Sequence, residues 1–156
     1  MAESAREGAR EEGALEITRR YEAPPERVWQ AWTEPRALSR WFGPGEPGSV
    51  TQADLEVRPG GRYTIAFRTP DGQEHRVSGS YETVEAPRRL TFSWAWQSTP
   101  ERVSFVALEF VPDGAGTLMR FRHDRFFDRA ALENHLGGWA ATLSKLDALL
   151  APTGPS

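Results

Sequence analysis

His123 is the residue of this sequence best suited by type and position to acid–base chemistry. It follows Met119 and Phe121 at two-residue spacing, which in a strand places side chains on one face. An inward-facing imidazole there could serve as a general acid or base, or hydrogen-bond to a polar group of a ligand. No Ser or Asp stands at the spacing of a catalytic motif, so a hydrogen-bonded core histidine is the competing interpretation.

Aromatic side chains are the second sign of a site. The chain has six Trp, eight Phe and three Tyr. Trp94 and Trp96 share one strand face with Phe92, and Trp139 would face them from a helix. Such rings form either a sealed core or the wall of an apolar ligand pocket.

Two tyrosines and two further histidines complete the candidates. Tyr63 and Tyr81 each place a hydroxyl on an inward strand face, where it can orient a ligand or bond to the main chain. His135 stands just before an apolar helix position, so we expect it at the flank of that helix. His75 follows Gln and Glu and is expected to be exposed.

The composition excludes several classes of site and partner. The chain has no cysteine, which excludes disulfides, thiolate zinc sites and cysteine nucleophiles. Its three histidines are scattered, so we expect no metal site and no cofactor. A net charge of −3 argues against nucleic acid as a partner. The sequence lacks an apolar run of about eighteen residues, so no membrane span is expected.

The length predicts one domain with tails at both ends. The chain has 156 residues, which is enough for a single hydrophobic core. Residues 1–13 are charged and lack an apolar anchor, so we expect a disordered N-terminal tail. The domain should span 14–151, followed by a Pro/Gly-rich tail over 152–156. The N-terminus lacks the apolar core of a secretory signal, which favours a cytoplasmic location.

The elements that must position these residues follow from the periodicity of the sequence. Residues 15–20 alternate like an edge strand, and Pro25 and Pro35 mark the starts of two short helices, the second ending near Phe42. A loop is expected over 43–48. Five further alternating runs predict an antiparallel meander with one solvated face; they lie near 63–67, 77–83, 90–96, 106–110 and 119–123.

One long helix is predicted at about 130–150. Its apolar residues follow at steps of four and three, which forms one continuous stripe. Asp128 precedes it and can cap its first turn. The simplest arrangement lays this helix against the concave side of the sheet, giving an α+β domain.

Four stretches of the chain together resemble one family: VWQAWTEPRALSRWFGP (28–44), DLEVRPGGR (54–62), GSY with APRRLTFSW (79–94) and HLGGW (135–139). The sequence is similar to bacterial proteins that resemble the C-terminal domain of the activator of the ninety-kilodalton heat-shock protein ATPase. These belong to the START-related SRPBCC superfamily. The resemblance covers nearly all of 15–150 and implies the helix-grip fold, in which a curved antiparallel sheet wraps around a long C-terminal helix.

The resemblance also implies an apolar cavity between the sheet and the last helix. We therefore expect binding of a hydrophobic small molecule of lipid, polyketide or aromatic type, by a monomer or homodimer. Strand alternation and the helix stripe predict the cavity wall, with His123 as its most central polar group. The expected wall is Tyr63, Phe67, Tyr81, Phe92, Trp94, Leu108, Phe121, His123, Trp139 and Leu143.

Two other functions compete with ligand binding. An enzyme of cyclase or hydrolase type would use His123 as acid or base and a tyrosine to polarise a carbonyl. A chaperone-associated interaction module would need an exposed apolar patch, which the outward strand residues do not provide. Because no catalytic constellation is recognisable, a binding protein is favoured over an enzyme.

Overall fold

A computed structural model describes residues 5–9, 13–43 and 48–152. Its strands and helices, in chain order, are β1 (Ala5–Ala9), β2 (Leu15–Tyr21), α1 (Pro25–Thr33), α2 (Pro35–Leu38), β3 (Val50–Leu55), β4 (Arg62–Arg68), β5 (Glu74–Glu85), β6 (Arg89–Trp96), β7 (Ser104–Asp113), β8 (Gly116–Asp124) and α3 (Arg129–Leu150).

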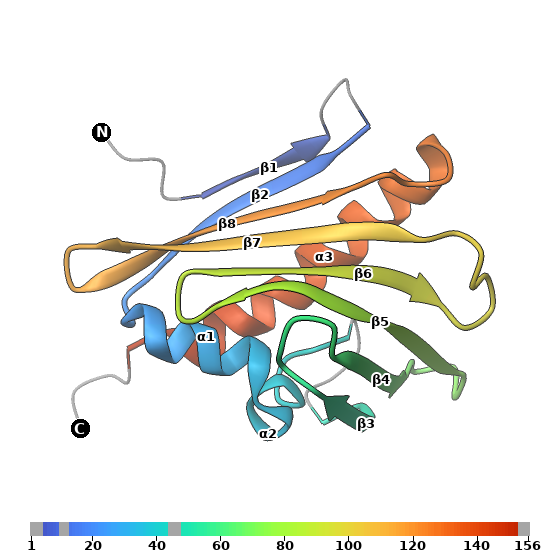
Figure 1. Cartoon of the computed structure of the whole chain (residues 1–156), viewed down its shortest axis with the longest axis horizontal. Coiled ribbons are helices and arrows are strands. Elements are labelled where there is room, and N and C mark those ends of the chain that lie inside the picture. Colours follow the sequence, from blue (N-terminus) through green and yellow to red (C-terminus); the bar gives the residue numbers. More distant parts are fainter. Residues whose placement is uncertain (1–4, 10–12, 44–47, 153–156) are drawn as a thin grey trace.

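The strands form one antiparallel sheet in the order β1-β2-β8-β7-β6-β5-β4-β3, and α3 runs across one of its faces (Figure 1). Strands β4 to β8 are joined in sequence as a meander, and β2 returns to pair with β8, placing Ile17 opposite Phe121. The two short helices α1 and α2 follow β2 and lie together (Figure 1); α1 contacts the inner strands β7 and β8, and α2 contacts the edge strand β3. The predicted α+β helix-grip fold is confirmed.

The N-terminal region differs from the expectation at one point. Ala5–Ala9, expected within a disordered tail, form β1 and pair with β2, so that Glu7 lies opposite Ile17. Strand β2 is therefore an inner strand and not the predicted edge. The short, charged β1 segment has little apolar pattern of its own, and its pairing comes from the open backbone of β2. Residues 1–4, 10–12 and 153–156 of the expected tails lie outside the described part.

The turn between α1 and α2 is determined by proline. Glu34 has extended backbone angles, φ −103° and ψ 126°, because the residue before a proline is driven away from helical conformation. The buried indole N–H of Trp41 donates to the Ala31 carbonyl at 2.9 Å and so fastens the chain after α2 to α1. Helix α2 ends at Leu38 rather than near Phe42. Residues 44–47 of the expected loop lie outside the described part.

Strand β3 was not predicted from the sequence. It pairs only with β4 and is half-buried or exposed along its whole length. Apolar and polar residues alternate in a strand when one of its faces is buried. Neither face of β3 is fully buried, so its sequence lacks this alternation.

Helix α3 covers the concave face of the sheet, as predicted. It begins at Arg129, and the Asp128 carboxylate accepts a hydrogen bond from the Ala131 N–H at 2.8 Å. Its buried residues include Leu132, Trp139, Leu143, Leu146 and Leu150, which form the predicted stripe. The core lies between this stripe and the inward residues of the sheet.

Candidate functional site: an aromatic pocket beside helix α3

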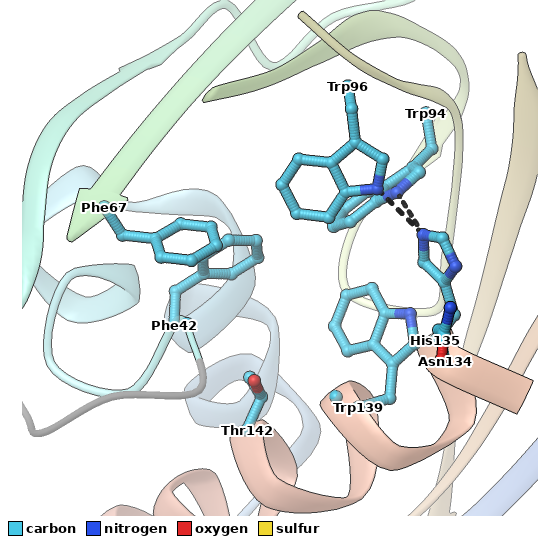
Figure 2. A pocket seen from close by; sticks show the side chains of 10 residues that line it. Phe42, Phe67, Trp94, Trp96, Asn134, His135, Trp139 and Thr142 are labelled. Carbon is cyan, nitrogen blue, oxygen red and sulfur yellow. Dashed lines mark hydrogen bonds between the residues drawn. The ribbon is translucent and has the colours of Figure 1, made fainter. Parts of the chain in front are cut away.

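A cavity of about 310 Å³ lies between helix α3, strands β4 and β6, and the segment that follows α2 (Figure 2). Five aromatic rings and five other residues line it: Phe42, Phe67, Trp94, Trp96 and Trp139, with Gly43, Asn134, His135, Gly138 and Thr142. Among the described residues, the lining includes no Asp, Glu, Lys or Arg side chain. It is therefore an apolar pocket with a few neutral polar groups at its edge.

The rings of the wall hold one another in fixed orientations. Trp94 and Trp139 lie 5.0 Å apart between ring centroids. Phe42 packs its ring at 87° to Trp139 and at 67° to Phe67, both near 6 Å. Tilted and edge-on packing of this kind is the favoured geometry for aromatic pairs. The wall is thus built by contacts between a helix, two strands and a turn that are distant in sequence.

His135 is the hydrogen-bond acceptor for two of these rings. Its Nε2 atom lies 2.9 Å from the indole nitrogen of Trp96 and 3.3 Å from that of Trp94 (Figure 2). Because an indole N–H can only donate, Nε2 carries no proton. The proton is on Nδ1, which donates to the Ala131 carbonyl at 2.7 Å. Burial lowers the pKa of His135, although the bond to Ala131 opposes this shift.

His123 forms a second set of hydrogen bonds, and its proton is on the other ring nitrogen. The indole N–H of Trp139 donates to its Nδ1 at 3.0 Å. The proton is therefore on Nε2, which donates to the Ser104 hydroxyl at 2.7 Å, and this hydroxyl donates to the Trp94 carbonyl. Burial lowers the pKa of His123 well below its ordinary value, and the neighbouring His135 adds to this effect. Both imidazoles are neutral at pH 7.

A family model described as "Activator of Hsp90 ATPase homolog 1-like protein" matches residues 22–151. The chain belongs to this family. The match covers both short helices, β3 to β8 and all of α3, and so contains every residue that lines the pocket.

Solved structures of family-type proteins share the fold over nearly their whole length. Protein Ms6760 from Mycobacterium smegmatis is 26% identical with a TM-score of 0.78, covering 98% of this chain and 99% of that one. CalU16 from Micromonospora echinospora is 30% identical with a TM-score of 0.68, covering 96% and 88%. The AHSA1 protein from Silicibacter pomeroyi is 25% identical with a TM-score of 0.76, covering 88% and 97%. No curated protein matches the sequence.

These similarities identify an SRPBCC domain, as the sequence resemblance implied. The family commonly binds hydrophobic ligands. Within the described residues, no helix is long and apolar enough to cross a membrane. The same residues contain no group of three or more His, Asp or Glu side chains able to hold a metal ion.

The structure divides the ten expected wall residues into three groups. Phe67, Trp94 and Trp139 line the pocket. Tyr63, Tyr81 and Phe92 lie instead around a separate void of about 20 Å³, which Trp94 also borders. The remaining four are core residues that do not line the pocket: Leu108, Phe121, His123 and Leu143.

His123 therefore does not occupy the central position that the strand pattern predicted. It is fully buried and both ring nitrogens are hydrogen-bonded; it contacts the rings of Trp94 and Trp139, which line the cavity, but does not line the cavity itself. In this geometry it is the hydrogen-bonded core histidine of the competing interpretation. Neither nitrogen can exchange a proton with a molecule in the pocket.

Neither of the two tyrosines lines the pocket. Tyr63 donates to the Ser93 carbonyl at 2.5 Å, which is the main-chain bond considered as an alternative. Burial raises the pKa of both Tyr63 and Tyr81 above the ordinary value. Both phenols therefore stay protonated.

The expectation for His75 was wrong. Its ring is half-buried, stacks on Phe67 at 5.5 Å and contacts the Thr69 hydroxyl at 3.2 Å. Neighbouring Gln and Glu residues suggested exposure. Alternation on β5 instead places His75 on the same face as buried Val77, opposite Phe67 of β4. His75 supports the pocket wall from behind without lining the pocket.

Several lining residues were missed from the sequence. Asn134, Gly138 and Thr142 follow one another at four-residue steps, which places them on one face of α3 beside the apolar stripe. This helical spacing was the available signal. Phe42 and Gly43 follow α2 in a turn, where no periodicity predicts a direction.

Proposed function

We propose that this protein binds a small, neutral, hydrophobic molecule in the aromatic pocket. The observation that carries the proposal is a cavity of about 310 Å³ whose wall, in the part of the chain that the structure describes, contains five aromatic rings and no charged side chain. Ligand pockets span about 300 to 1,000 Å³. This one is at the small end, which favours a ligand of a few rings over a two-chain lipid.

The polarity of the wall favours a neutral ligand. An ionised group placed in the pocket would lose its hydration without meeting an opposite charge among the described lining residues, which is costly. The indole N–H groups of Trp94, Trp96 and Trp139 are already bonded to histidines. They present ring surfaces to the cavity, and only Asn134 and Thr142 offer side-chain hydrogen bonds.

Two adjacent glycines of α3 provide a matched test. Gly138 lines the pocket, whereas Gly137 is exposed, and a Cβ atom on either would meet nothing within 4 Å. Gly138→Leu should fill the cavity, and Gly137→Leu should point to solvent with the same gain in helix propensity. Affinity would be measured by fluorescence titration with N-phenyl-1-naphthylamine, a neutral apolar probe excited by tryptophan emission.

We expect Gly138→Leu to weaken probe binding at least tenfold and Gly137→Leu to bind like the wild type. Thermal unfolding should show that both variants are folded. Equal affinities in the two variants, or no binding by the wild type, would contradict the proposal. Native mass spectrometry of freshly purified protein would then search for the natural ligand as a co-purified apolar molecule.

The two competing functions gain less support. A cyclase or hydrolase acting through His123 requires a nitrogen that faces the cavity, and both are bonded within the core. An interaction module would need a contiguous exposed apolar patch. The exposed large apolar side chains of the described residues are Val103, Val111 and Phe127. Val111 lies near the end of β7, whereas Val103 and Phe127 lie outside that strand, so the three do not form one run. A cytoplasmic monomer or homodimer that binds its ligand without a cofactor remains part of our proposal.

A further inference from the structure

Two rings of the pocket wall depend on one acceptor atom. Trp94 and Trp96 both donate to Nε2 of His135, and neither indole has another acceptor among the described residues. A buried or half-buried N–H group that loses its acceptor destabilises the conformation that keeps it there, because its desolvation is no longer compensated. The positions of both rings are therefore coupled to the state of a single nitrogen.

These three residues also separate two cavities. A second cavity of about 260 Å³ lies on the other side of Trp94, Trp96, Asn134 and His135. It is bordered by the segment after β6, with Thr99 and Arg102, and by the start of α3. Trp94, Trp96 and His135 thus border both cavities, so the two indole rings have free space next to them when their hydrogen bonds are lost.

We propose that His135 is the positioning residue of the pocket and couples ligand affinity to pH. The unprotonated Nε2 holds Trp94 and Trp96 in the wall, whereas a proton on Nε2 releases both indoles and weakens binding. This inference rests on the proposed function, because it concerns the same pocket.

Protonation of His135 changes the number of hydrogen-bond donors and acceptors on its ring. A protonated imidazole has two N–H donors and no acceptor, so each indole N–H would then face another N–H. Such a state cannot keep the two bonds at 2.9 and 3.3 Å. The ring is only half-buried, unlike His123, so a proton can reach it without unfolding of the core.

The charges around His135 come from three elements. His123 on β8 lies 5.2 Å away between ring centroids, and it disfavours a second positive charge if it is itself protonated. Arg102, after β6, and Asp128, before α3, line the adjoining cavity with opposite signs. On α3 itself, Glu133 is paired with Arg129. Since burial lowers the pKa of His135, the loss of affinity should occur below pH 6.5.

The substitution His135→Gln keeps a hydrogen-bond acceptor and removes the titratable group. In His135→Gln the amide oxygen can still accept indole N–H groups but cannot be protonated in this pH range. His135→Leu has no acceptor. Titration with N-phenyl-1-naphthylamine, which does not ionise between pH 5 and 8, would compare wild type and both variants at pH 7.5 and 5.5.

We expect the wild type to bind at least threefold more weakly at pH 5.5, His135→Gln to bind equally at both pH values, and His135→Leu to bind weakly at both. A pH dependence that persists unchanged in His135→Gln would overturn the inference. So would wild-type affinity in His135→Leu at pH 7.5.

Two further measurements have readouts other than probe affinity. Tryptophan emission without probe should titrate in the wild type and not in His135→Gln. If emission behaves so but no probe binds at any pH, the proposed function fails while the positioning role of His135 stands. In the wild type alone, NMR titration of the His135 ring should show a lower pKa with bound probe, by linkage. An unchanged pKa in the presence of bound probe would overturn the coupling.

Discussion

The indole N–H of Trp139 donates to Nδ1 of His123 across 3.0 Å, which joins the middle of α3 to the end of β8 inside the core. The same indole ring packs on Phe121 at 4.6 Å and forms part of the pocket wall. One hydrogen bond therefore sets the rotation of a ring that serves the core on one side and the cavity on the other.

Removal of this hydrogen bond should lower the free energy of unfolding and have little effect on the affinity of the pocket. His123→Phe leaves the Trp139 N–H buried without an acceptor, so we expect a loss of about 1–3 kcal/mol in the free energy of unfolding. Probe affinity of the folded protein should stay within about threefold of the wild type. Denaturant unfolding and probe titration on the same samples measure the two effects.

A double-mutant cycle provides the control. Trp139→Phe removes the donor, and in the His123→Phe background neither partner remains unsatisfied. We expect a coupling free energy of about 0.5–3 kcal/mol between the two positions. Strictly additive costs would show that this hydrogen bond has no net role in stability.

Gly79 should tolerate no side chain. An alanine Cβ at this position would lie 2.0 Å from the Ser93 carbonyl oxygen, which also accepts the Tyr63 hydroxyl. Because the clash is with backbone, the pairing of β5 with β6 must shift. We expect Gly79→Ala to cost more than about 3 kcal/mol, at or above the usual range for overpacking. Circular dichroism during thermal unfolding would detect it, and a loss below about 1 kcal/mol would contradict the geometry.

Gly137 should behave in the opposite way. It is exposed in the interior of α3, and a Cβ atom there meets nothing within 4 Å. Replacement of a helical glycine by alanine stabilises by about 0.8–1 kcal/mol, because fewer conformations are lost on folding. Gly137→Ala should therefore raise the free energy of unfolding by roughly that amount in chemical denaturation. A destabilised variant would show that this face of α3 is covered.

Stability should fall on mild acidification. His123 and His135 have folded-state pKa values below the ordinary 6.5, so the unfolded chain binds protons more readily. Their contribution is fully present above pH 6.5 and is lost as pH falls from 6.5 toward the folded-state values. The slope is at most roughly 1.4 kcal/mol per pH unit for each histidine.

Urea unfolding at pH 5.5, 6.0 and 7.5 would measure this slope. The double variant His123→Phe with His135→Gln lacks both titrating groups and should show a much flatter profile over the same range. A wild type that is equally stable at all three pH values would contradict the neutral, acceptor-bearing states assigned to the two rings.

Much of the fold is local in origin and was predictable. Apolar residues at helical spacing place Leu132, Trp139 and Leu143 on one side of α3, because 3.6 residues per turn leave no other choice. Alternation likewise assigns Phe92 and Trp94 to the inner face of β6. The family motifs in the chain also indicate the helix-grip arrangement.

The sequence by itself thus determined most of the elements, their inward faces and the family, whereas the tertiary structure decided the pairing of β1 with β2 and of β3 with β4 and which inward residues border empty space. His123 and His135 both belong to the aromatic interior, but only His135 lines the cavity. Alternation specifies a face and not a depth along it; depth depends on where α3 crosses the sheet and on how far Phe42 reaches from its turn. The direction of each indole N–H is likewise set by side-chain packing between distant segments, which periodicity does not encode.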